Sequence, residues 1–146
     1  MNTIGSDGPQ HPTLPLASID RLRALRDQIK AAPKGSQELD EALRLLLTIH
    51  ERQAVKAFIQ PSASIDDALA YLNILLPDWW LHTMREERTE VIYRDDEHKP
   101  TGAWSAAIQS KRGGQLTFGS AHTPALALID AVLNVRIGMV SGRWTI

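Results

Sequence analysis

The densest group of side chains able to bind a cation lies at residues 95–98, where three carboxylates are followed by an imidazole (Asp95, Asp96, Glu97 and His98). Carboxylate oxygens are the ligands that hard cations such as Ca²⁺ prefer. Four consecutive residues in a loop, however, cannot all turn towards one ion without further ligands from elsewhere in the chain. We therefore expect a solvated charged loop here, because runs of charge are usually solvated.

The remaining candidates for catalysis are isolated in the sequence. The five histidines show neither a paired helical spacing nor the HExxH pattern of zinc hydrolases. Ser120 and His122 are close together, but no third partner and no sharp nucleophile turn accompany them. The chain has no cysteine, which excludes thiolate nucleophiles, thiolate metal ligands and disulfides. The sequence thus predicts no catalytic residue, no metal site and no cofactor.

Four tryptophans are the most conspicuous candidates for binding a partner. Trp79 and Trp80 are adjacent, so on a strand they point to opposite faces, one into the core and the other towards solvent, a second layer or a partner. Trp104 begins a predicted strand and is expected in the core. Trp144, in the C-terminal tail, fits either an added strand or the anchor of a second chain. Exposed tryptophans are typical interface hot spots, which makes Trp80 and Trp144 candidate partner-binding residues.

The charge of the chain argues against a general nucleic-acid or membrane surface. Sixteen Lys and Arg against 17 Asp and Glu give a net charge of −1, which builds no long-range field for steering phosphates. Double-stranded RNA-binding domains share the order helix, strands, helix, but they grip phosphate with basic residues at the start of the last helix. Here that start is uncharged. Lys111 and Arg112, in a predicted loop, are the remaining candidate contacts, together with the arginines of the first helix.

The first part of the chain predicts a helical hairpin. Ser18 is a good N-cap, and a turn at residues 33–36 ends with Ser36, a second N-cap. We expect the second helix to continue as far as Ile59, because its apolar period persists, and to stop before Pro61. The apolar positions recur at helical spacing (Ile19, Leu22, Leu25 and Ile29, then Leu39, Ala42, Leu43, Leu46 and Leu47).

A third helix and several strands follow. Ser64 with Asp67 three residues on resembles a capping box, and an apolar stripe runs from there to Pro77. Short aromatic and β-branched stretches then predict two hairpins, the second turning at Gly113–Gly114. The expected strands are Trp79–Met84, Glu90–Arg94, Ala103–Gln109 and Leu116–Phe118.

The last predicted helix is apolar on almost every side. Thr123 is its N-cap and Pro124 its first residue, where a missing N–H costs nothing. We expect the helix to end near Ile137, with Gly138 as a left-handed terminator. Such a helix must be covered on more than one side, by the sheet and by either the N-terminal hairpin or another subunit. Self-association is therefore an expectation.

Together these elements predict an α+β fold. A small antiparallel sheet of three or four strands is layered with helices in the order α-β-β-(β)-α and preceded by the N-terminal helical hairpin. The expected units are a disordered leader (residues 1–17), the hairpin (residues 18–60), the α+β sandwich (residues 64–138) and a tail (residues 139–146). The leader resembles neither a signal peptide nor a membrane span, so we expect a cytoplasmic protein.

The segment from Ser64 to Val135 resembles the phage ABA-sandwich domain and related prophage-encoded proteins of unknown function. The residues that carry the resemblance are "SIDDALAYLNILLPDWW", a strand pair and "AHTPALALIDAVL"; the upstream "GSQELDEALRLLL" is similar to a short helix that precedes the domain. The resemblance covers about half of the chain and implies helices on both faces of a small sheet. It implies no activity, cofactor or catalytic residue. His50–Pro61 and the tail after Gly138 depart from it.

These observations favour a non-enzymatic phage or prophage accessory protein that acts by protein–protein binding. Inhibition of a host process, such as an antiviral defence system, suits a small protein without a recognisable site. One alternative is a nucleic-acid-binding accessory protein that uses Lys111, Arg112 and the arginines of the first helix. Another is an enzyme or small-ligand-binding protein with a pocket that gathers His82, His98 and the acidic loop.

Overall fold

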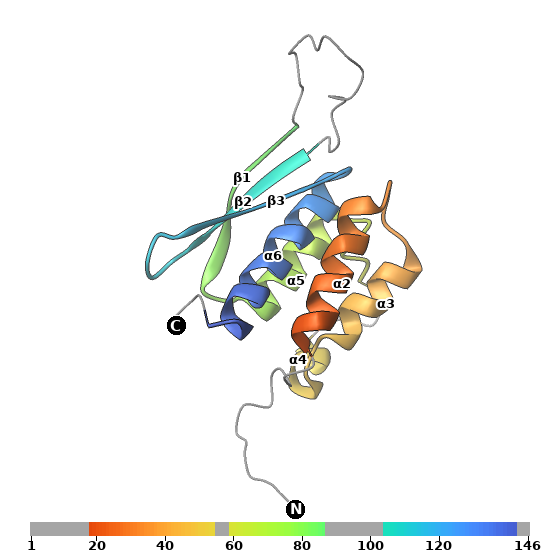
Figure 1. Cartoon of the computed structure of the whole chain (residues 1–146), viewed down its shortest axis with the longest axis horizontal. Helices are drawn as coiled ribbons and strands as arrows, with labels where there is room; N and C mark the ends of the chain where they lie inside the picture. The colour runs from red at the N-terminus through yellow and green to blue at the C-terminus, as the bar shows by residue number, and fades with distance from the viewer. Residues whose placement is uncertain (1–17, 55–58, 87–103, 143–146) are drawn as a thin grey trace, which may run out of the picture.

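The computed structural model describes residues 18–54, 59–86 and 104–142 of the chain. These residues form five helices and one three-stranded antiparallel sheet (Figure 1), which confirms the predicted α+β class. None of the described helices is long and apolar enough to cross a membrane. The elements are α2 (Ser18–Ala31), α3 (Gln37–Leu45), α4 (Ile49–Ala54), α5 (Ile65–Leu75), β1 (Trp79–Glu86), β2 (Trp104–Ser110), β3 (Leu116–Ala121) and α6 (Pro124–Val140).

The three strands follow one another across the sheet in the order β1-β2-β3, so β1 and β3 are its two edges. The turn between β2 and β3 contains Gly114 with φ of 70°, a left-handed conformation that favours glycine. β1 and β3 both extend beyond the predicted Met84 and Phe118. β1 pairs with β2, and the predicted strand Glu90–Arg94 lies outside the described residues.

The predicted helix starts are confirmed at three places. The side chain of Ser36 accepts a hydrogen bond from Leu39 N at 3.1 Å, and Ser64 and Thr123 begin α5 and α6 in the same way. These bonds satisfy backbone donors that have no partner within the helix. Asp67 does not complete the expected capping box, because its Oδ2 accepts from the backbone N–H of Gln60 at 2.8 Å.

The second predicted helix is interrupted, and its expected continuation to Ile59 is wrong. α3 ends at Leu45 and α4 begins at Ile49. Between them Thr48 forms a capping box: its Oγ1 accepts from Glu51 N at 3.1 Å, and its own N–H donates to Glu51 Oε1 at 2.9 Å. The pattern T-x-x-E therefore starts a new helix where apolar periodicity alone predicted one continuous helix.

The last helix is longer than predicted. α6 continues to Val140, and Gly138 is buried within it instead of ending it. The left-handed residue is Gly142, with φ of 82°, which follows the C-cap Ser141. The predicted end of this helix near Ile137 is therefore wrong.

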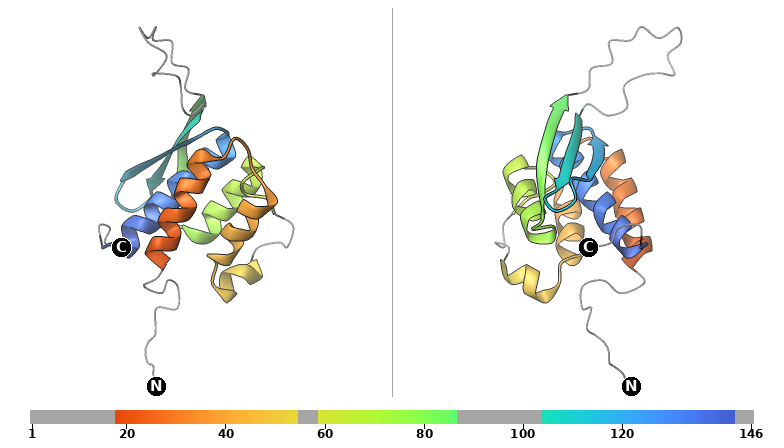
Figure 2. Two further views of the ribbon diagram at one scale, coloured as in Figure 1. Left: turned by 45° about the vertical axis from the view of Figure 1, so that its right-hand side comes forward. Right: turned by 90° about the vertical axis from the view of Figure 1, so that its left-hand side faces the viewer.

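α6 is the central element of the molecule. It lies against the sheet on one side, mostly against β3 and β2, and against α2 and α5 on the other. Figures 1 and 2 show this arrangement, with the sheet on one side of the group of helices. Residues 125–133 and 135–138 of α6 are all buried. The all-round apolar helix is thus covered within one chain, partly by the N-terminal helix α2, and needs no second subunit.

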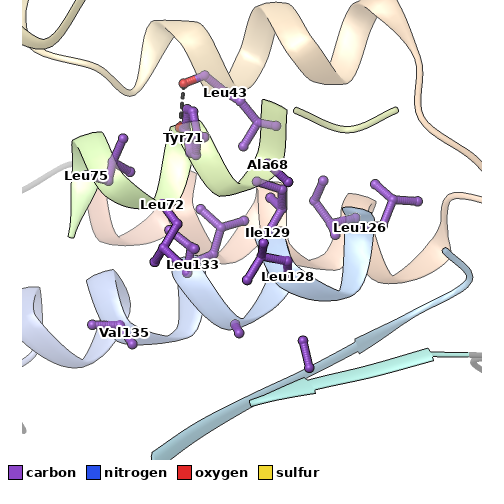
Figure 3. Close-up of a cluster of buried hydrophobic side chains, with 14 of the residues drawn as sticks. Leu43, Ala68, Tyr71, Leu72, Leu75, Leu126, Leu128, Ile129, Leu133 and Val135 are labelled. Carbon is purple, nitrogen blue, oxygen red and sulfur yellow. Dashed lines mark hydrogen bonds between the residues drawn. The ribbon is translucent and has the colours of Figure 1, made fainter. Parts of the chain in front are cut away.

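Hydrogen bonds connect α5 to both α3 and α6 (Figure 3 shows the bond to α3). Tyr71 of α5 is buried, and its hydroxyl donates to the carbonyl oxygen of Leu43 in α3 at 2.7 Å. Burial raises the pKa of Tyr71 far above its usual value. Arg136 of α6 is also buried, and it donates to Leu75 O of α5 at 3.4 Å; burial lowers its pKa.

The closest approach between a helix and the sheet occurs at Gly119 of β3. A Cβ atom added to Gly119 would lie 2.3 Å from Ala131 N and 2.5 Å from Ala127 O, both of them backbone atoms of α6. No such contact is tolerated in a real structure, and backbone atoms cannot move aside as a flexible side chain can. α6 can therefore rest directly on β3 only because residue 119 has no side chain and the two facing residues are alanines.

We predict that Gly119→Ala destabilises the protein by about 2 kcal/mol or more, because the added methyl group forces strand and helix apart in a closely packed region. Urea unfolding followed by circular dichroism measures the change in the free energy of unfolding. Gly113→Ala is the matched control, since a Cβ there meets its nearest atom, Gln115 Cγ, at 3.9 Å. Equal stabilities of the two variants would contradict the close contact.

Candidate functional site

One face of the sheet is not covered by any described element. The described helices lie on the opposite side of the sheet (Figure 1), whereas the resemblance implies helices on both faces. The strand register defines the uncovered residues, because directly opposed residues in an antiparallel sheet share a face. We call this surface the outer face. It consists of Trp80, His82, Thr83 and Arg85 of β1, Ser105, Ala107 and Gln109 of β2, and Leu116, Phe118 and Ser120 of β3.

The outer face carries an exposed apolar group. Trp80 is 50% exposed, Phe118 60% and Leu116 41%. Leu45 of α3 is the one other large apolar residue this exposed in the described part of the chain. The predicted division of the tryptophan pair is confirmed, since Trp79 is buried and Trp80 faces outward. Trp104, expected in the core, is partly buried and packs against the edge of the core.

The register places these side chains in two neighbouring rows. Trp80 lies opposite Gln109, which lies opposite Leu116; the next row joins Thr83, Ala107 and Phe118. Ala107 is only 2% exposed although no helix covers it, so its larger neighbours close over it. The apolar side chains thus lie in two neighbouring rows, with the polar Gln109 between Trp80 and Leu116 and the small Ala107 beside Phe118.

An irregularity in β1 shapes the same surface. The register shifts between Leu81 and Thr83, so His82 is an extra residue in the strand. Such a bulge leaves one residue unpaired and increases the local twist. His82 has no partner on β2 and is exposed, as is Thr83 next to it.

The one fixed charge of the outer face is positive, and residues of both signs lie at its margin. Arg85 is exposed in the row beyond Phe118, opposite Ser105. At the other end, Lys111 and Arg112 occupy the turn after β2, beside the row that contains Trp80. The Lys111 backbone N–H donates to Asp78 O at 2.8 Å, and Arg112 Nε lies 3.6 Å from the carboxylate of Asp78.

The edge of β3 is closed by polar side chains of α6. Asn134 donates from Nδ2 to the carbonyl oxygen of Phe118 at 2.9 Å, and Asp130 Oδ2 accepts from the N–H of Ser120 at 3.0 Å. Backbone groups on a sheet edge can otherwise pair with another strand. These two bonds also fix the backbone on either side of Gly119, and so fix the direction in which Phe118 points.

Two cations of α2 complete this polar group. Lys30 Nζ lies 2.8 Å from Asp130 Oδ2, and Arg26 donates to Asn134 Oδ1 at 3.2 Å. Asp130 is fully buried and its Oδ1 has no hydrogen-bond partner among the described residues. Burial is the main cause that raises the pKa of Asp130, and the bond from Lys30 opposes it. Arg26 is thus partly buried and bonded within the protein, whereas Arg21 and Arg23 of the same helix are exposed.

The other predicted candidates do not come together in the described structure. Trp144, the acidic residues 95–97 and His98 lie outside the described residues, so the predicted tail anchor and acidic loop remain predictions. Ser120 and His122 are both exposed. Within residues 18–54, 59–86 and 104–142, no three His, Asp or Glu side chains are arranged to hold a metal ion.

Leu116 and Phe118 are the surface residues that sequence reasoning missed. The alternation of β3 does contain the signal, because Thr117, Gly119 and Ala121 are small and the residues between them are larger or polar. Which set faces solvent depends on the side from which the helices pack, and the strand alone does not contain that information.

No protein-family model matches the chain, and neither the curated proteins nor the solved structures contain a match to it.

We predict that Asp130 makes the stability of the protein depend on pH in a defined direction. Because its pKa is raised in the folded state, the folded protein holds this proton more tightly than the unfolded chain does. The contribution of Asp130 is therefore most favourable below about pH 4, the ordinary aspartate pKa, and declines as pH rises through the folded value.

The measurement is urea unfolding of the wild type and Asp130→Asn between mildly acidic and neutral pH. The free energy of unfolding of the wild type, minus that of the variant, should fall as pH rises. Subtraction removes the titration of the other carboxylates. A difference that rises with pH would show that Lys30 lowers the pKa of Asp130 more than burial raises it.

Proposed function

We propose that this chain is a non-enzymatic binding protein that recognises another protein through the outer face of its sheet. The single observation that supports this most is that Trp80, Leu116 and Phe118 are all exposed, in two neighbouring rows of the one sheet face that no described element covers. Single exposed apolar residues are ordinary, but a contiguous group of them marks an interaction site. Tryptophan at the centre of such a group is typical of an interface hot spot.

The resemblance to the phage ABA-sandwich domain supports a phage or prophage setting for this activity. In that setting we propose that the bound protein belongs to the host or the phage, and that binding inhibits a host process such as an antiviral defence system. A protein of this size can act by occupying a surface of its target, which requires no catalytic group.

Nucleic-acid binding is the second candidate, and one observation favours it. Trp80 and Phe118 are exposed aromatic rings on a sheet beside Arg85, and bases of single-stranded nucleic acid stack on such rings. However, Leu116 offers no ring for stacking, and the chain has a net charge of −1. Few phosphate contacts release few counterions, so the affinity gained in this way is small.

We predict that Trp80→Ser combined with Phe118→Ser abolishes capture of the bound protein from host lysate. Loss of a hot-spot side chain costs about 2 kcal/mol or more, which corresponds to a roughly 30-fold weaker affinity. Both positions are exposed, so the fold should persist, and circular dichroism with thermal unfolding checks that it does. Captured proteins are quantified by mass spectrometry.

Leu45→Ser is the matched control, because it removes an equally exposed apolar side chain from α3. The control should capture the same proteins as the wild type. Point variants are preferable to a truncation after Gly138, since Met139 and Val140 belong to α6 and pack against the core. Capture that survives the double variant, or that Leu45→Ser reduces equally, would contradict the assignment of the outer face.

A further inference from the structure

The outer face lacks one kind of charge altogether. None of its ten residues is Asp or Glu, whereas Arg85 contributes a fixed positive charge. No described carboxylate forms an ion pair with Arg85. This contrasts with the chain as a whole, in which acidic residues outnumber basic ones by 17 to 16. The outer face therefore offers a positive charge and no negative one, although the exposed Glu86 follows Arg85 at the end of β1.

The cations stand at the two ends of the apolar rows. Arg85 lies beyond the row of Phe118, and Lys111 follows β2 beyond the row of Trp80. Along β2, Ser105 opposite Arg85 is six residues from Lys111, which spans about 20 Å at the rise of a β-strand. Arg112 at the second end is partly compensated by Asp78, at 3.6 Å. Lys111 is exposed, and its Nζ lies 3.5 Å from Pro77 O, a neutral group.

We propose that the occupant of the outer face is a segment of a partner protein that is apolar in its centre and acidic towards its ends. This inference rests on the proposed function and specifies its partner. The apolar centre covers Trp80, Leu116 and Phe118, and the acidic side chains meet Arg85 and Lys111. Opposite charges at the rim of an interface fix register and exclude wrong partners, while apolar contacts at the centre supply affinity.

Two other occupants fit the same surface less well. A second copy of this chain, laid face to face on the first, would bring a surface without carboxylates against another, so Arg85 would gain no opposite charge from the facing surface. Single-stranded nucleic acid would satisfy the cations, but it would place polar sugars and phosphates on Leu116. Both are distinguishable outcomes of the experiment below.

The experiment selects ligands from random sequences, so the partner does not have to be identified first. A library of random short peptides is bound to the immobilised full chain, after peptides that bind the Trp80→Ser/Phe118→Ser variant have been removed. We expect the enriched peptides to combine Asp or Glu with Leu, Ile, Val or aromatic residues. Failure to enrich any peptide, or enrichment of neutral or basic ones, would overturn the inference.

Charge reversal tests the electrostatic part with one enriched peptide, by fluorescence anisotropy. Arg85→Glu should weaken binding about tenfold, because it replaces an attraction by a repulsion. A peptide whose acidic residue facing Arg85 is changed to Lys should bind Arg85→Glu more tightly than it binds the wild type. Arg44→Glu on α3 makes the same change of net charge and should leave affinity unchanged. Equal losses with both variants would overturn a specific role for Arg85.

Two further measurements identify another occupant of the outer face if the proposal is wrong. Nucleic acid would be the occupant if oligothymidylate bound more tightly than the peptides and if Trp80→Ser abolished that binding. A dimer in light scattering that the Trp80→Ser/Phe118→Ser variant dissociates would place a second copy there. If protein capture requires the outer face but the enriched peptides are not acidic, the proposed function stands and this inference fails. If the Trp80→Ser/Phe118→Ser variant captures the same proteins as the wild type, the proposed function fails as well.

Discussion

The contact between the backbones of β3 and α6 at Gly119 governs most of the remaining structure. Because the helix backbone lies directly on the strand, with Ala127 and Ala131 facing the glycine, β3 has one permitted orientation. Side chains alternate along a strand, so the contact that turns residue 119 inward also turns Leu116, Phe118 and Ser120 outward. The outward direction of Leu116 and Phe118 is therefore a geometric consequence of how the core is packed. The same contact brings α6 to the centre of the molecule, between the sheet and α2 and α5.

The polar group around Asp130 makes this arrangement specific. A buried carboxylate with an unpaired oxygen is costly, and the ion pair with Lys30 offsets the cost only in part. In exchange, Asp130 and Asn134 bind β3 backbone groups on either side of Gly119, so a shift of the strand along the helix would break both bonds. They also occupy two groups of the β3 edge, where another strand could otherwise pair. The neighbouring apolar surface thus lies beside an edge that is partly closed to sheet extension.

Local signals in the sequence predicted the fold well wherever one residue determines the outcome. Ser36, Ser64 and Thr123 begin helices because a side-chain oxygen next to free N–H groups has the same effect in any fold. The interruption at Thr48 could have been predicted from its capping box, but apolar periodicity outweighed it. Gly138 was misinterpreted because a glycine near a helix end can equally be a terminator or a small residue in a packed interior. Only the position of the neighbouring elements distinguishes the two cases.

The outer face was predictable in part, and the missing part has a physical cause. Adjacent tryptophans on a strand must point in opposite directions, so an exposed Trp80 followed from the sequence. The excess of apolar residues, in contrast, was assigned to α6, which is the most apolar helix and is also the best covered. Whether a helix is covered depends on the whole arrangement of the fold. Here α2, α5 and the sheet surround α6, and no described helix packs on the outer face of the sheet. A domain with a single central helix and one sheet keeps one sheet face exposed unless another molecule, or residues beyond those described, cover it. Polar residues at positions 80, 116 and 118 would leave the core unchanged, so the fold itself does not require the apolar side chains found there, and binding gives them a physical reason to be present.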